Sequence, residues 1–102
     1  MSTVKVVRYR TKPEHAEENA ELVREVYAEL AADDPGGLQY VTLRLDDGVT
    51  FVHVATVDGE ANPLASSAAF ERFQSEIAHR CVEGPIAMDA SVVGSYSTAI
   101  GR

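Results

Sequence analysis

Histidine is the residue type in this chain best suited to proton transfer, and His53 has the most unusual setting. It lies in the middle of Thr-Phe-Val-His-Val-Ala-Thr-Val, residues 50–57, a run rich in β-branched residues. An imidazole buried in such a strand needs either a hydrogen-bond partner or a chemical role. The residue types favour a core histidine bonded to Tyr40, Arg8 or a neighbouring subunit. The alternative is a catalytic proton acceptor or donor in a pocket between a sheet and its helices.

The other two histidines are predicted to be surface residues. His15 falls in the first turn of a helix, where an exposed position is expected. His79 follows Phe70 by nine positions in the sequence, which places it about half a helical turn from the apolar stripe. We therefore expect His79 to point toward solvent.

Aromatic residues are spread along the chain and offer walls for a binding pocket. Such residues, with a few polar tips, suit a flat organic ligand, and they equally suit the core of a domain of this size. The aromatic candidates for substrate binding are Tyr40, Phe51, Phe70, Phe73 and Tyr96.

Motifs for phosphate or metal binding are missing from the sequence. It has no Gly-rich phosphate loop, no cysteine pair and no His-x-x-x-His, so we expect no metal site. Its one cysteine, Cys81, falls on an apolar helical face and is expected to be a buried, inert thiol.

Length and charge narrow the class of protein. The 102 residues fit one domain, residues 1–102. A net charge of −7 argues against nucleic acid and against an anionic membrane surface as partners. No apolar run reaches the ~18 residues of a membrane span, and the first residues lead directly into a predicted strand rather than a signal peptide. The expected location is cytoplasmic.

Hydrophobic periodicity predicts four strands and two helices. The first strand is followed by a helix that begins after Lys12-Pro13. Two strands come next, joined by a hairpin at Asp46-Asp47-Gly48. The second helix is capped by Ser66 or Ser67 and ends at Gly84-Pro85, and a last strand follows it. The predicted strands cover residues 4–11, 38–45, 50–57 and 88–97, and the helices cover about 13–32 and 66–83.

This βαββαβ order predicts an α+β fold, a four-stranded antiparallel sheet with two helices on one face and the first and third strands central. Residues 50–57 are apolar on both alternating faces. The helices cover one face, and a chain this short has little left to cover the other. A partner subunit is the natural cover, so we expect a homodimer.

The layout resembles the antibiotic biosynthesis monooxygenase family. The resemblance rests on Lys12-Pro13 after the first strand, the long acidic helix, the strand from Phe51 to Asp58, and Ser67-Ala-Ala-Phe70. It implies a ferredoxin-like monomer and a dimeric α/β barrel whose sheets meet face to face. The haem-degrading branch of the family has Trp and His at positions that here are Leu64 and Gln74, which argues against haem degradation.

The resemblance also implies an activity: a monooxygenase without a cofactor that acts on an aromatic or quinol-like metabolite. The substrate would supply the electrons and would be held as an anion against oxygen in a dry cavity. His53 would accept the proton, and Arg8 or Tyr40 would stabilise the anion. Two alternatives remain open, a non-catalytic dimeric module that binds a small apolar metabolite, and an isomerase or cyclase on the same barrel.

Overall fold

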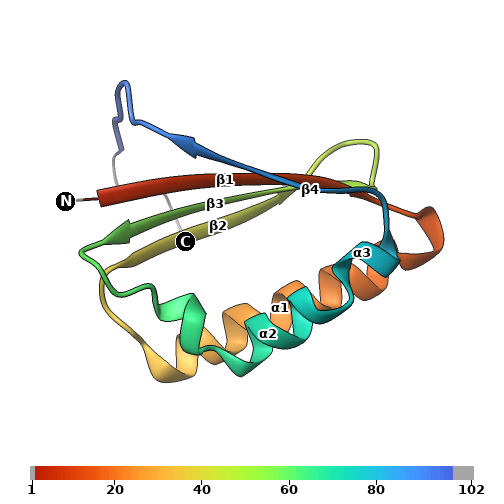
Figure 1. Cartoon of the computed structure of the whole chain (residues 1–102), viewed down its shortest axis with the longest axis horizontal. Coiled ribbons are helices and arrows are strands. Elements are labelled where there is room, and N and C mark those ends of the chain that lie inside the picture. Colours follow the sequence, from red (N-terminus) through yellow and green to blue (C-terminus); the bar gives the residue numbers. More distant parts are fainter. Residues whose placement is uncertain (1, 98–102) are drawn as a thin grey trace.

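The structure is a computed structural model that describes residues 2–97, and its centre is an antiparallel sheet of four strands. The order across the sheet is β2-β3-β1-β4, so the first and third strands are central, as predicted (Figure 1). This is the ferredoxin-like α+β arrangement expected from the sequence. The strands are β1 (Ser2–Thr11), β2 (Leu38–Arg44), β3 (Thr50–Asp58) and β4 (Cys81–Ala90).

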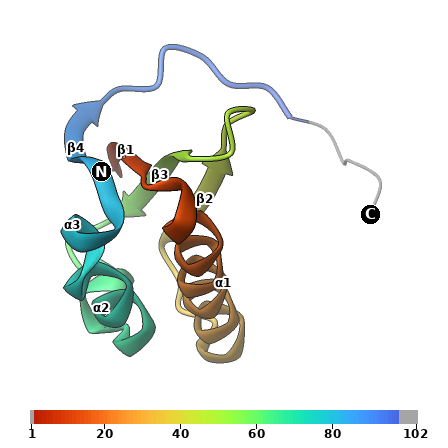
Figure 2. The ribbon, with the colours of Figure 1, turned by 90° about the vertical axis from the view of Figure 1, so that its right-hand side faces the viewer.

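The helices lie together on one face of this sheet, as Figure 2 shows with the sheet seen nearly edge-on. Pro13 opens a short 3-10 turn that leads into α1, and Asp34 ends α1 in a left-handed conformation with φ of 47°. Ser67 caps α2 by accepting a hydrogen bond from the amide of Phe70 at 3.0 Å. The helical elements are η1 (Pro13–His15), α1 (Ala16–Asp33), η2 (Pro63–Ser66), α2 (Ala68–Ser75) and α3 (Ile77–Arg80).

The end of the second helical region and the last strand differ from the prediction. The helix ends at Arg80, and Cys81 already begins β4, which ends at Ala90 rather than continuing to residue 97. Gly84 and Pro85 lie inside β4, at a register shift opposite Tyr9. A proline is tolerated there because β4 is an edge strand and the shift is a β-bulge, where no ladder amide is required. The Gly-Pro pair therefore marks a bulge and not a helix end.

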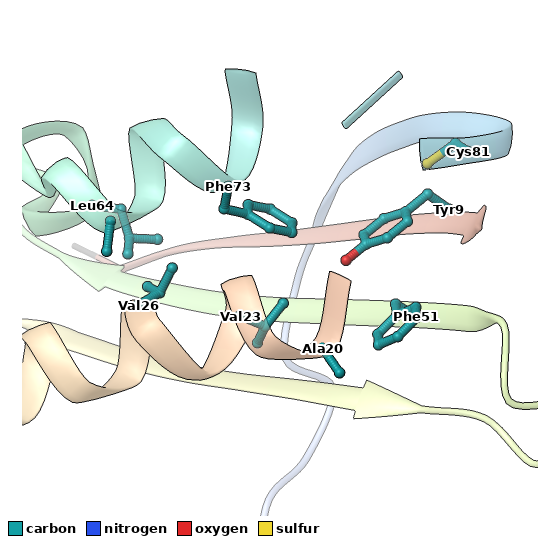
Figure 3. Packing of buried hydrophobic residues seen from close by; sticks show 9 residues of the cluster. Tyr9, Ala20, Val23, Val26, Phe51, Leu64, Phe73 and Cys81 are labelled. Carbon is teal, nitrogen blue, oxygen red and sulfur yellow. The ribbon is translucent and has the colours of Figure 1, made fainter. Parts of the chain in front are cut away.

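The main core fills the space between the sheet and the helices. Tyr9 and Phe51 stack there with ring centroids 5.5 Å apart, and Phe73 reaches toward them from α2 (Figure 3). Cys81 is buried as expected, but it lies at the start of β4 and not on a helical face. The buried hydrophobic cluster comprises Tyr9, Ala20, Val23, Val26, Phe51, Leu64, Ala69, Phe73 and Cys81.

The opposite face of the sheet has an apolar middle and no cover within residues 2–97. Strand register aligns Val41, Val54, Val6 and Met88 in one row across all four strands. Val41 and Met88, at the two ends of this row, are 49% and 63% exposed. The second apolar face predicted from residues 50–57 is therefore present and open.

Candidate functional site

A cavity of about 490 Å³ lies between the helix-side face of the sheet and α2. Its size falls in the range of small-molecule sites, and most of its lining is apolar. The polar groups of Tyr9, Tyr40 and His53 are grouped in this lining, and Phe70 and Phe73 face them from α2. The remaining lining includes Val7, Ala55, Val57, Leu64 and Ile77, with the exposed Lys5, Glu60 and Asn62.

His53 is the centre of the polar group in this cavity. Its position in β3, paired with Val7 of β1 and Thr42 of β2, turns the side chain toward the helices, and it is only 5% exposed. The Nε2 atom lies 2.8 Å from the Tyr9 hydroxyl, and the Nδ1 atom lies 2.7 Å from the Tyr40 hydroxyl. The bond to Tyr40 confirms one of the partners predicted for a core histidine. Both ring nitrogens are thus occupied by hydrogen bonds.

The hydrogen bonds continue from Tyr9 into the helices. Asn19 of α1 donates from Nδ2 to the Tyr9 hydroxyl at 2.8 Å, and its Oδ1 accepts from Arg80 Nε at 3.0 Å. Arg80 also donates to the carbonyl of Phe73 at 2.7 Å, and its guanidinium lies 5.4 Å from the centre of the Phe73 ring. Asn19 and Arg80 are 0% and 2% exposed. These residues form one buried chain from Arg80 through Asn19, Tyr9 and His53 to Tyr40, called here the polar chain.

Three members of the polar chain were not predicted as site residues: Tyr9, Asn19 and Arg80. Tyr9 belongs to the first strand, and the other two belong to the helices. Asn19 and Arg80 carry a signal in the sequence, because each is a polar residue on an apolar helical stripe. Asn19 falls between Ala16 and Val23, all of which are buried on one face of α1. Arg80 follows Phe73 by seven positions, which is the spacing of a shared helical face. A polar side chain at such a position must find a buried partner.

Burial sets the protonation states at the centre of the site. It lowers the pKa of His53 to about 4, so the imidazole is neutral near pH 7. Burial also raises the pKa of both Tyr9 and Tyr40 above the ordinary value, so both hydroxyls keep their protons. The centre of the site therefore contains neutral donors and acceptors, and the one permanent charge of the polar chain is the Arg80 guanidinium at its far end.

The structure brings together some of the predicted binding residues and separates others. Tyr40, Phe70 and Phe73 line the cavity with His53, whereas Phe51 lies behind Tyr9 and outside the lining. The prediction that Arg8 binds the substrate in this cavity is wrong. Arg8 precedes Tyr9 by one position, so strand alternation turns it to the opposite sheet face, where its guanidinium lies 4.0 Å from the Glu83 carboxylate.

Tyr96 is a second correction. Because β4 ends at Ala90, Tyr96 lies in the irregular segment that follows and is 90% exposed. His79 is exposed as expected, with its ring 5.7 Å from that of His15, which lies 2.9 Å from Glu18. Within residues 2–97 no cluster of three His, Cys, Asp or Glu side chains is arranged to hold a metal ion.

Comparison with known proteins decides the family. The family model described as antibiotic biosynthesis monooxygenase matches residues 2–56, more than half of the chain. The chain belongs to this family. The match covers β1, α1, β2 and most of β3, and so includes Tyr9, Asn19, Tyr40 and His53. No curated protein matches the sequence of this family member.

Solved structures resemble this family member over nearly its whole length. A structure described as a putative antibiotic biosynthesis monooxygenase from Bacteriodes thetaiotaomicron has a TM-score of 0.79 at 15% identity, covering 97% of this chain and 96% of that one. A structure with the same description from Nitrosomonas europaea has a TM-score of 0.73 at 18% identity, covering 90% of each chain. A structure described as a dimeric ferredoxin-like protein of unknown function from Jannaschia has a TM-score of 0.67 at 16% identity. This match covers 90% of this chain and 100% of that one. At these identities the likeness establishes the fold.

Proposed function

We propose that this protein is a small monooxygenase that binds an aromatic or quinol-like metabolite in the cavity beside His53. The observation that carries the proposal is the composition of the cavity wall, which is mostly apolar and aromatic, with the compact polar group of Tyr9, Tyr40 and His53 and a few exposed polar side chains. Such a wall suits a flat ring system with one oxygen directed at the polar group. Membership of the monooxygenase family supports the same reaction class.

The proposed reaction draws its electrons from the substrate. An anthrone-type substrate gives up a CH₂ proton to the bulk solvent and is held in the cavity as the enolate, whose carbon bonds to O₂ after electron transfer. The peroxide anion then takes up a proton from the solvent. The resulting hydroperoxide loses water, so one oxygen atom becomes the new carbonyl and the other leaves in H₂O. A largely apolar cavity favours this sequence because it limits the access of water to the reactive intermediate.

His53 and Tyr40 form the polar centre of the proposed site. With a pKa of about 4 and both nitrogens bonded, His53 is a weak proton acceptor at neutral pH. Its proposed part is to position the Tyr40 hydroxyl next to the oxygen of the substrate anion. A hydroxyl in a dry site stabilises such an oxyanion more strongly than it would in water.

A homodimer is part of the proposal. The open sheet face carries an apolar row that crosses all four strands, and a second copy of the chain would bury it. The similar structure from Jannaschia, described as dimeric, supports this assembly. None of the helices in residues 2–97 has the combined length and hydrophobicity of a membrane span.

Oxygen uptake with a panel of quinols and anthrones tests the proposal. We expect uptake that depends on the substrate and falls in Tyr40→Phe and His53→Ala, with His79→Ala as a matched surface control. If no member of the panel is oxidised, or if Tyr40→Phe and His53→Ala leave the rate unchanged, the proposed reaction at this site is wrong.

One observation favours a second function, a non-catalytic module that binds the same class of molecule. The fully bonded ring of His53 leaves no free base in the centre of the polar group. Submicromolar binding of an aromatic ligand without any oxygen uptake would support the binding module over the oxygenase.

A further inference from the structure

We propose that Arg80 fixes the direction of every hydrogen bond in the polar chain, so that Tyr40 presents its hydroxyl proton to the cavity and selects ligands with an acceptor oxygen. The ligand class is an aromatic molecule with a carbonyl or phenolate oxygen at the polar wall. This inference rests on the proposed function only for the statement that the cavity binds a ligand.

The first step is the orientation of the Asn19 amide. A guanidinium only donates hydrogen bonds, so the Asn19 atom 3.0 Å from Arg80 Nε must be the carbonyl oxygen. The NH₂ group of Asn19 therefore faces the Tyr9 hydroxyl, 2.8 Å away. The permanent charge of Arg80 thus removes the usual ambiguity between the two ends of an amide side chain.

The second step is the direction of the Tyr9 hydroxyl. Its oxygen accepts from Asn19, so its proton needs a different partner, and Tyr9 is 1% exposed. In the part of the chain that the structure describes, the remaining hydrogen-bond partner of this hydroxyl is His53 Nε2, at 2.8 Å. Tyr9 therefore donates to Nε2, and Nε2 is the unprotonated nitrogen of the ring.

The third step passes the direction to Tyr40. A neutral imidazole with an unprotonated Nε2 carries its proton on Nδ1, which donates to the Tyr40 oxygen at 2.7 Å. Thr42 Oγ1, at 3.2 Å from Nδ1, is the longer second contact. Burial raises the pKa of the Tyr40 hydroxyl, and Thr42 also forms a side-chain hydrogen bond with Tyr40 that acts to lower this pKa, as a donor to the Tyr40 oxygen would. The Tyr40 oxygen therefore accepts hydrogen bonds from its neighbours, and Tyr40 lines the cavity. Its own proton is thus free for a ligand.

The charge of Arg80 adds a preference for negative charge in the ligand. Among the described residues no carboxylate lies within salt-bridge distance of this guanidinium, although it is 2% exposed. The charge is held by neutral dipoles, Asn19 Oδ1 and the carbonyl of Phe73. An uncompensated buried cation favours anionic groups nearby, and Phe73 is part of the cavity wall.

Nitrogen NMR of the imidazole ring tests the direction of the chain in the free protein. We expect the wild type to hold His53 with the proton on Nδ1. A ring protonated on Nε2 would overturn the proposal, and this readout needs neither a ligand nor turnover. If the Nδ1 proton is found and no oxygen uptake is detected, the oxygenase fails while the inference stands.

Asn19→Asp is a nearly isosteric variant that should reverse the chain. A carboxylate accepts from both Arg80 and Tyr9, so Tyr9 would turn its proton away from His53, whose ring would then donate from Nε2 to Tyr9. Its Nδ1 would become an acceptor and would take the Tyr40 proton away from the cavity. We expect the imidazole proton to move from Nδ1 to Nε2 in this variant, and an unchanged ring would contradict the mechanism.

A pair of ligands tests the donor itself. 9-Fluorenone and fluorene differ in a carbonyl against a CH₂ group, and titration gives the ratio of their Kd values. In the wild type, we expect the preference for fluorenone over fluorene to be about tenfold larger than in Tyr40→Phe or Asn19→Asp. A factor of this size corresponds to the loss of one hydrogen bond. The same ratio in all three proteins would overturn Tyr40 as the donor. If neither ligand binds, the selection claim fails and the NMR result alone decides the direction.

Discussion

The amide of Asn19 in α1 lies 2.8 Å from the hydroxyl of Tyr9 in β1, and this contact joins the helix layer to the polar side of the cavity. Without it, the side chain of Arg80 and the ring of His53 would belong to separate hydrogen-bonded groups. The contact makes the stability of the core and the chemistry of the site depend on the same buried side chain.

Asn19→Leu is therefore expected to destabilise the protein strongly. The leucine leaves the Tyr9 hydroxyl and the Arg80 guanidinium each without a buried partner, at a cost of about 3–5 kcal/mol in the free energy of unfolding. Urea denaturation measures the change. Glu21→Leu, an exposed position on the same helix, is the control and should change the free energy by less than about 0.5 kcal/mol. A loss in Asn19→Leu no larger than in the control would mean that the chain contributes little to stability.

Acid should destabilise the protein between pH 6.5 and pH 4 through His53. The unfolded chain binds a proton near pH 6.5, whereas burial lowers the pKa of the folded ring to about 4. The unfolded state therefore holds more protons in this window, and the free energy of unfolding falls as the pH falls, by about 3 kcal/mol in total. Chemical denaturation at a series of pH values measures the slope.

A His53→Gln variant should lose most of that slope, and His79→Gln should keep it because His79 is exposed. Glu17, Glu29 and Asp47 have carboxyl pKa values that are lowered in the folded state, first by hydrogen bonds to Arg44, Ala69 and Thr50 respectively. Their stabilisation is complete well above the ordinary carboxyl pKa values, 4.5 for Glu and 3.8 for Asp, and is lost as the pH falls below them, so it overlaps the window of His53 only at its acid end. Equal slopes in the wild type and His53→Gln would show that the buried ring does not control the acid sensitivity.

The open sheet face predicts a homodimer, and charged side chains introduced on that face should prevent the two copies from associating. Val41→Glu and Met88→Glu place carboxylates at the two ends of one apolar row, on side chains that are already half or more exposed. We expect sedimentation to report a dimer for the wild type and a monomer for the double variant, with the fold retained in both. Ala78→Glu, exposed on α3, is the control and should stay dimeric. A monomeric wild type at micromolar concentration would contradict the assembly.

The sequence contains most of the fold because the strongest patterns are local. The two apolar faces of residues 50–57, the Pro13 helix start and the Asp46-Asp47-Gly48 hairpin all appear as predicted. The boundary at Gly84-Pro85 was predicted wrongly because the same dipeptide suits a helix end and an edge-strand bulge. Only the pairing of β4 with β1 separates the two, and that pairing is a contact between distant residues.

The site was predictable in its centre and not in its extension. His53 stands out because an ionisable residue interrupts an apolar strand, and Tyr40 is a natural partner on the neighbouring strand. Asn19 and Arg80 are separated by 61 positions, and neither pattern alone indicates that their side chains meet. Arg8 was misplaced by one step of strand alternation, since a single position decides which sheet face a side chain occupies.

The cavity can be closed without touching the polar chain, and this separates ligand binding from the stability of the core. Ala55 lines the cavity beside Tyr40 in the strand register and makes no side-chain hydrogen bond. Ala55→Leu should fill part of the space and weaken fluorenone binding by about tenfold or more, since overpacking of this kind costs about 1–3 kcal/mol. Titration of the variant measures the loss, and Ala65→Leu, exposed and outside the cavity lining, is the matched control. Because the leucine adds apolar surface to a partly empty site, thermal unfolding should be unchanged or slightly raised. An unchanged Kd in Ala55→Leu would place the ligand elsewhere on the protein, whatever the direction of the Tyr40 hydroxyl.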